Sequence, residues 1–130
     1  MELSEIKEFF KNDTYAVDTT GIEIAEARRN YARITLKVDN RHRNAMGGLM
    51  GGVCFTMADF AAAIAGNVDA PPTVAISASI NFVNGLKGSV LTAEASCIKD
   101  GRGSTVFRVD ITDDTGALIA TSTVTGFRKG

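Results

Sequence analysis

Asp59 is the residue best placed to do chemistry, because it is the only acidic or basic side chain between Val53 and Val68. Its neighbours are mostly alanine and other apolar residues, and a glycine pair, Gly51-Gly52, precedes them. This pattern predicts a helix that is buried on most of its circumference. A carboxylate buried there is costly unless it is paired, hydrogen-bonded or neutralised, and no basic residue lies one turn away. Asp59 is therefore a candidate functional carboxyl. The alternative is a carboxylate that backbone groups or water satisfy at an oligomer interface.

The histidine, the two cysteines, Asn44 and the glycine pair can each be explained by a structural role without chemistry. His42, the only histidine, stands between two arginines in a polar run, which predicts a solvated side chain rather than a base. Cys54 and Cys97 lie in apolar or alternating segments without metal-ligand spacing, so we expect two buried thiols of a reducing compartment. Asn44 can cap a turn, and the glycine pair can simply allow close helix packing.

The hydrophobic pattern predicts the elements that must position these residues. Leu3, Ile6, Phe9 and Phe10 share one face of a short N-terminal helix, which we expect to cover the sheet. Apolar and polar residues alternate from Ile22 and over residues 31–39, 74–82, 91–97, 107–111 and 118–127. The last three strands are joined by hairpin turns with Asp/Gly chemistry. One apolar helix on one face of an antiparallel, twisted sheet is the predicted α+β fold, in a single domain of residues 1–130.

Composition narrows the function classes. The chain has 130 residues, enough to bury a core without disulfides. Its 14 basic and 15 acidic residues nearly cancel, which predicts no general attraction to nucleic acid or to an anionic membrane. The start lacks a secretory signal, and the apolar segment is too short to span a bilayer, so we expect a cytoplasmic protein. The long sheet and apolar helix leave surface that one chain does not cover, which predicts a homodimer.

The segment from Asn44 to Gly52, followed by Phe55, Ala58-Asp59 and Asn67, resembles a known signature. It is similar to that of hotdog-fold acyl-CoA thioesterases of the phenylacetate-degradation type, in the 4-hydroxybenzoyl-CoA thioesterase superfamily. The resemblance covers essentially the whole chain. It implies the hotdog fold, in which a curved antiparallel sheet wraps a long central helix. It also implies hydrolysis of acyl-CoA to free acid and CoA without a metal or redox cofactor, by homodimers that often pair into tetramers.

The resemblance further implies roles for three residues. Asn44 and Gly51 polarise the thioester carbonyl, and Asp59 acts as general base or as nucleophile. Gly51 and Asp59 are eight residues apart, so one helix separates them by roughly 12 Å. A donor and a nucleophile that serve one carbonyl must each lie within about 3 Å of the reacting atoms. The site is therefore expected to combine Asn44 and Gly51 of one subunit with Asp59 of its partner.

Two positions depart from the family pattern. Met50 stands where a histidine is common, and methionine can neither donate a hydrogen bond nor protonate a thiolate. Ala75 occupies a position where some members carry a helping hydroxyl, with Ser77 and Ser79 as nearby substitutes on the same face. The residues expected to bind substrate are Met50, Gly52, Ser77, Ser79, Asn81 and Phe82. The departures leave a non-catalytic acyl-CoA-binding protein as the alternative function. A hotdog hydratase or dehydratase is disfavoured, because no histidine follows His42.

Overall fold

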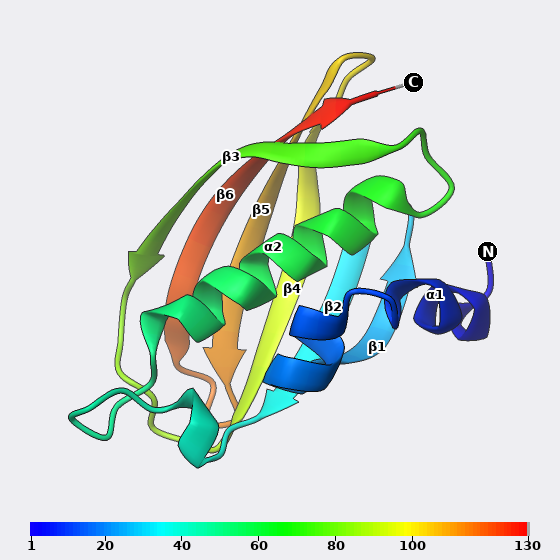
Figure 1. The fold of residues 1–130 in the computed structure, drawn as a ribbon. Coiled ribbons are helices and arrows are strands. Elements are labelled where there is room, and N and C mark those ends of the chain that lie inside the picture. Colours follow the sequence, from blue (N-terminus) through cyan, green and yellow to red (C-terminus); the bar gives the residue numbers. More distant parts are fainter. Residues whose placement is uncertain (130) are drawn as a thin grey trace.

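The computed structural model describes residues 1–129 and joins their strands into one antiparallel sheet of order β1-β2-β4-β5-β6-β3. The described helices and strands are α1 (Leu3–Phe10), a π-helical segment (Tyr15–Thr20), β1 (Glu23–Arg28), β2 (Tyr31–Lys37), a 3-10 turn (Asn40–His42), α2 (Gly51–Asn67), β3 (Thr73–Phe82), β4 (Val90–Asp100), β5 (Ser104–Asp113) and β6 (Leu118–Arg128). The fold is the predicted one, a central helix wrapped by a curved antiparallel sheet (Figure 1).

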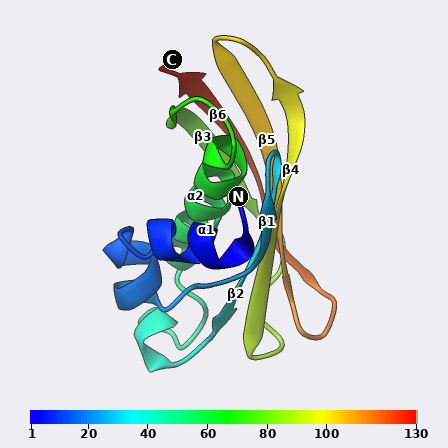
Figure 2. The ribbon, with the colours of Figure 1, turned by 90° about the vertical axis from the view of Figure 1, so that its right-hand side faces the viewer.

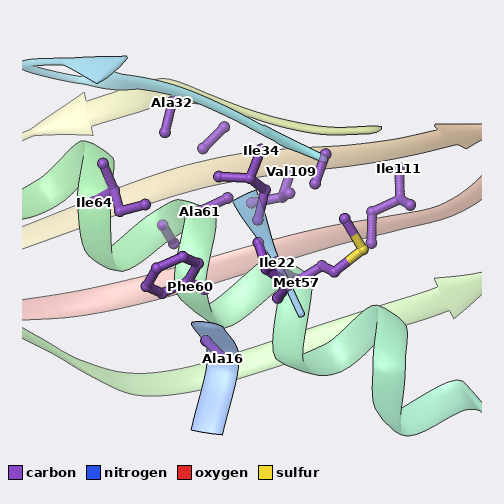
Figure 3. Close-up of a cluster of buried hydrophobic side chains, with 14 of the residues drawn as sticks. Ala16, Ile22, Ala32, Ile34, Met57, Phe60, Ala61, Ile64, Val109 and Ile111 are labelled. Atoms are coloured by element: carbon purple, nitrogen blue, oxygen red, sulfur yellow. The ribbon is translucent and has the colours of Figure 1, made fainter. Parts of the chain in front are cut away.

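The sheet buries α2 against its concave face. In the view turned by 90°, strands β1, β2, β4 and β5 lie on one side and the helices on the other (Figure 2). Met57, Ala61 and Ile64 of α2 are fully buried, and they meet strand residues such as Ile34 and Val109 in the core (Figure 3). Ten of the 17 residues of α2 are buried, which confirms a helix apolar on most of its circumference. None of the helices described in residues 1–129 is long and apolar enough to cross a membrane.

The N-terminal segment packs on the side of α2 away from β3 (Figure 1). Helix α1 contacts β1 and buries Ile6 and Phe10, whereas Leu3 and Phe9 are exposed, so the four residues do not share one buried face as we expected. Consecutive helical residues point about 100° apart, so Phe9 lies at the edge of the face that Phe10 turns toward the core. The Phe10 ring packs edge-on against the Phe60 ring of α2, with the ring centroids 6.1 Å apart. This contact fixes the segment beside the middle of the helix.

Strand β3 forms one edge of the sheet. It bonds β6 on one side, and its other side is open in the single chain. Apolar side chains along it are exposed: Val74 by 43%, Ile76 by 64% and Phe82 by 58%. A long, exposed, apolar edge strand is a template for pairing with another chain.

Candidate functional site

Asn44 holds a tight turn before α2. Its Oδ1 accepts hydrogen bonds from the backbone N–H groups of Met46 (3.0 Å) and Gly48 (2.9 Å). Gly47, between them, has φ +84°, in the left-handed region that favours glycine. The turn-capping interpretation of Asn44 is therefore correct. It is also compatible with a role as donor, because binding through Oδ1 fixes the amide and leaves Nδ2 free of any partner in residues 1–129.

Gly51 begins α2 and lies under the ring of Phe82. A Cβ atom placed on Gly51 would sit 3.0 Å from Cζ and 3.2 Å from Cε1 of Phe82. The same atom on Gly52 would meet nothing within 4 Å. The first N–H groups of a helix lack an internal acceptor, so the backbone at Gly51 presents donors and a positive dipole end. Glycine at this position keeps that helix start accessible beside an aromatic ring.

Asn44, Gly51 and Phe82 line one cavity of about 450 Å³. The loop after β3, at residues 83–86, forms its other wall. Cys54 also lines it, but burial raises the pKa of its thiol to about 11, so it is not a thiolate at neutral pH. Cys54 is buried as predicted, whereas Cys97 is only half-buried. Met50, just before the helix, has an exposed side chain and donates its backbone N–H to the His42 carbonyl.

Asp59 lies elsewhere on α2. Residue Asp59 is exposed in the single chain although neighbouring groups partly enclose its carboxyl, so the expectation of a fully buried carboxylate is wrong. Gly52, Phe55 and Asp59 recur at helical spacing on the strip of α2 that faces away from the sheet. Asp59 lines a second cavity, of about 280 Å³, which runs between α2 and the first half of β3.

The surroundings of Asp59 favour its protonated form. Partial burial, and then the negative charge of Asp13, raise the pKa of the Asp59 carboxyl above its usual range. Asp13 follows Phe10 by three residues, and the Phe10–Phe60 contact brings this segment to α2 beside Asp59. Asp13 is not among the residues predicted from the sequence. Its position in a polar N-terminal stretch carries no signal, because only the tertiary packing brings it near the helix.

His42 is buried, at 2% exposure, so the expectation of a solvated side chain is wrong. The backbone N–H of Asp39 donates to its Nδ1 at 2.9 Å, and its Nε2 lies 2.7 Å from the Thr20 carbonyl oxygen. With Nδ1 accepting, Nε2–H donates, and both ring nitrogens are occupied. The 3-10 turn at residues 40–42 directs the His42 side chain into the protein, although its sequence neighbours are polar. His42 thus ties the loop before Asn44 to the N-terminal segment, and it is not free to act as a base.

A β-bulge divides the predicted substrate-binding residues of β3. Ala75 pairs with Gly126, but Ser77 pairs with Thr125, so Ile76 is an extra residue. The bulge puts Ser77 and Ser79 on the opposite face from Ala75, and the expectation of a shared face is wrong. The residues that face away from α2 are Ser77, Ser79 and Asn81, paired with Thr125, Thr123 and Thr121. Phe82 faces α2, as its position over Gly51 requires.

Within one chain, the candidate site is therefore in two parts. The two groups expected to polarise a carbonyl, Asn44 and Gly51, share one cavity, and the carboxylate of Asp59 lines the other. The two cavities have no lining residue in common. One carbonyl cannot meet all three groups of the same chain.

The chain belongs to the thioesterase superfamily, whose family model matches residues 46–120. Its fold is that of the hotdog thioesterases. The acyl-coenzyme A thioesterase PaaI of Escherichia coli is 30% identical over 112 residues, 85% of this chain and 79% of that protein. The 1,4-dihydroxy-2-naphthoyl-CoA hydrolase of Listeria monocytogenes is 29% identical, over 83% of this chain and 90% of that protein. A thioesterase protein from Streptococcus pneumoniae, solved with coenzyme A, superimposes with a TM-score of 0.86 at 29% identity, covering 93% of this chain and 97% of that one.

Proposed function

We propose that this protein hydrolyses acyl-CoA thioesters to a free acid and CoA, at a site that two copies of the chain complete. The observation that carries the proposal is the separation of Asn44 and Gly51 from Asp59 into two cavities of one chain. Membership of the thioesterase superfamily supports the reaction, and the coenzyme A in the Streptococcus pneumoniae structure supports the substrate class.

The open edge of β3 offers a way to join the two halves. At its end, Phe82 covers Gly51, and at its start, Val74 and Ala75 line the Asp59 cavity. Two copies of an edge strand can pair antiparallel about a two-fold axis. An axis near Ala78 sets residue 82 of one strand opposite residue 74 of the other. The Gly51 helix start of one copy then faces the Asp59 cavity of the partner, and the reverse holds at the second site.

The chemistry follows from the groups that meet there. The N–H groups at Gly51 and Nδ2 of Asn44 hydrogen-bond the thioester oxygen as it gains negative charge. Asp59 takes a proton from a water molecule that attacks the carbonyl carbon, or it attacks that carbon itself. In the second route the C–S bond breaks to give a mixed anhydride and CoA thiolate; water then hydrolyses the anhydride to the free acid and Asp59, and the thiolate takes up the proton that the water releases. In the water route, the C–S bond breaks, the CoA sulfur leaves as thiolate, and the proton held by Asp59 returns to it. A raised pKa makes Asp59 a stronger base than an ordinary aspartate.

Met50 is compatible with this reaction. A free thiol has a pKa of about 8.5, so a thiolate is a stable leaving group that needs little help from a general acid near neutral pH. The proposed reaction requires no metal or redox cofactor. The alternative, an acyl-CoA-binding protein without turnover, predicts saturable binding of acyl-CoA with no release of free CoA.

The test compares Asp59→Asn with the wild type in a free-thiol assay across short-chain, long-chain and aryl acyl-CoA substrates. Loss of a general base or nucleophile lowers the rate by about 10²-fold or more, with acyl-CoA still bound. Asp18→Asn is the matched control, because Asp18 is an exposed acid of the π-helical segment and its loss changes the net charge equally. Turnover retained by Asp59→Asn contradicts the assigned role, and a wild type that binds acyl-CoA without releasing CoA contradicts the thioesterase proposal.

A further inference from the structure

Asn67, the last residue of α2, has a side chain that bonds the start of β3. Its Oδ1 accepts a hydrogen bond from the backbone N–H of Thr73 at 2.8 Å, and its Nδ2 donates to the Thr73 carbonyl at 3.0 Å. The same Nδ2 donates to the carbonyl of Ala63 at 2.8 Å. Asn67 is part of the sequence signature, and the proposed reaction does not use it. Its amide is thus fully engaged with backbone groups of the helix and of the strand.

The bonded groups of Thr73 lie on the open edge of β3. On the other side of the strand, the Pro72 carbonyl accepts from the N–H of Lys129, just after β6. Successive residues of an antiparallel strand present their N–H and C=O groups to opposite sides, so those of Thr73 point away from β6. The amide of Asn67 therefore occupies the place that a residue of an added strand would take opposite Thr73.

The free part of this edge has defined ends. Before Thr73, residues 71–72 are prolines, which have no N–H to donate to another strand. At the other end, β3 stops at Phe82. The edge left free runs over residues 74–82, with residue 78 at its centre. Two copies of this stretch overlap fully only when they pair antiparallel about Ala78.

The register of this pairing sets the geometry of the proposed composite site. Asp59 lies about two helical turns before Asn67 on the same strip of α2, and both line the cavity that Thr73 also lines. The helix start of the partner reaches this cavity through the paired strands. A slip by one residue moves the partner by about 3.3 Å. A misplacement of about 1 Å can already cost roughly 10²-fold in rate.

We propose that Asn67 is a positioning residue that sets the register of the two β3 edges, and thereby the distance between Asp59 of one copy and the Gly51 helix start of the other. This inference rests on the proposed function and deepens it. Asn67 acts through the backbone, because its amide keeps Thr73 out of the pairing. The same amide holds the free edge at a fixed distance from the helix that carries Asp59.

The register is measured by disulfide formation between single cysteines placed on the edge. Ser77→Cys, Ala78→Cys and Ser79→Cys are each oxidised in the full chain, with the unaltered protein as the blank for its two native cysteines. A residue on the axis lies opposite its own copy, with Cα atoms about 4.5–5.5 Å apart, within the range of a disulfide. Residues 77 and 79 are displaced from their copies by about 6.6 Å along the strand. Crosslinking is therefore expected to be fastest for Ala78→Cys.

Asn67→Ala removes three hydrogen bonds and frees Thr73 to pair. The crosslinking maximum should then leave residue 78 or spread over its neighbours, and kcat should fall by about 10²-fold. KM should change little, because Asn67 does not line the cavity at Asn44. Asn67→Asp is a second variant, since an oxygen in place of Nδ2 faces two carbonyls. Thr115→Val removes a hydroxyl bond to Asp113 outside both cavities, and it controls for lost stability alone.

The outcomes separate this inference from the thioesterase proposal. The crosslinks report the register without any hydrolysis, so a maximum displaced by the Asn67 variants but not by Thr115→Val supports the inference even if no thioester is cleaved. Asn67 variants that are merely less stable, with the maximum still at residue 78, overturn it and leave the thioesterase proposal intact. A displaced maximum with the kcat of an active wild type unchanged also overturns it. A wild type that crosslinks at none of the three positions contradicts the pairing of the β3 edges, and the inference with it.

Discussion

Replacing Gly51 with alanine tests the role of the helix start. The new Cβ lies 3.0 Å from Cζ of Phe82, so the ring must shift by a few tenths of an ångström. Phe82 is more than half exposed, so its ring has room to move. Alanine also favours a helix over glycine by roughly 0.5–1 kcal/mol, which offsets part of the strain. We therefore expect the melting temperature of Gly51→Ala to stay close to that of the wild type.

Activity should respond very differently. The methyl group occupies the space through which a carbonyl would approach the backbone donors, and loss of one such donor costs about 10²–10³-fold in kcat. Gly103→Ala is the matched control, because it adds the same methyl group outside the site with nothing within 4 Å of the new atom. The assay is kcat/KM for CoA release, with thermal melts of each variant. A Gly51→Ala enzyme as active as Gly103→Ala and the wild type would refute the reasoning.

Two further perturbations follow from contacts that only the structure reveals. Asp13→Asn removes the negative charge that, after burial, raises the pKa of Asp59. Because the base must be deprotonated, the acidic limb of the kcat/KM–pH profile should move to lower pH, and an unmoved limb would exclude this coupling. His42→Ala removes two hydrogen bonds and a buried ring, and should lower the free energy of unfolding by roughly 2–4 kcal/mol in denaturant titrations. An unchanged stability would show that His42 does not tie the loop to Thr20.

The fold was predictable because local pattern and tertiary packing agree. Alternation along 31–39 and the apolar run after Gly51 each specify an element that the sheet then buries. The apolar pattern of the helix could not show that Asp59 lies on its exposed strip. An apolar segment still keeps one exposed strip when only part of its circumference meets the sheet, and Gly52, Phe55 and Asp59 occupy that strip.

The finer features of the site depend on geometry that a pattern does not record. The extra residue at Ile76 reverses the faces of Ser77 and Ser79, although the alternation reads continuously across it. The buried His42 ring is held by hydrogen bonds to backbone groups of Asp39 and Thr20. The polar sequence around His42 does not reveal these partners. The effect of Asp13 on Asp59 becomes visible only when distant segments are packed together.

The central claim is that two copies of the chain complete each site, and it has a direct test in a mixed dimer. Asn44→Asp keeps the oxygen that holds the turn but removes the Nδ2 donor, and Asp59→Asn removes the base. Each variant alone should be inactive. The two are co-expressed with different affinity tags and purified through both.

Each mixed pair then carries one site with two wild-type halves and one with two altered halves, so it should recover about half of the wild-type kcat per pair of chains. A mixed dimer as inactive as its parents would contradict a site built from Asn44 and Gly51 of one copy and Asp59 of the other.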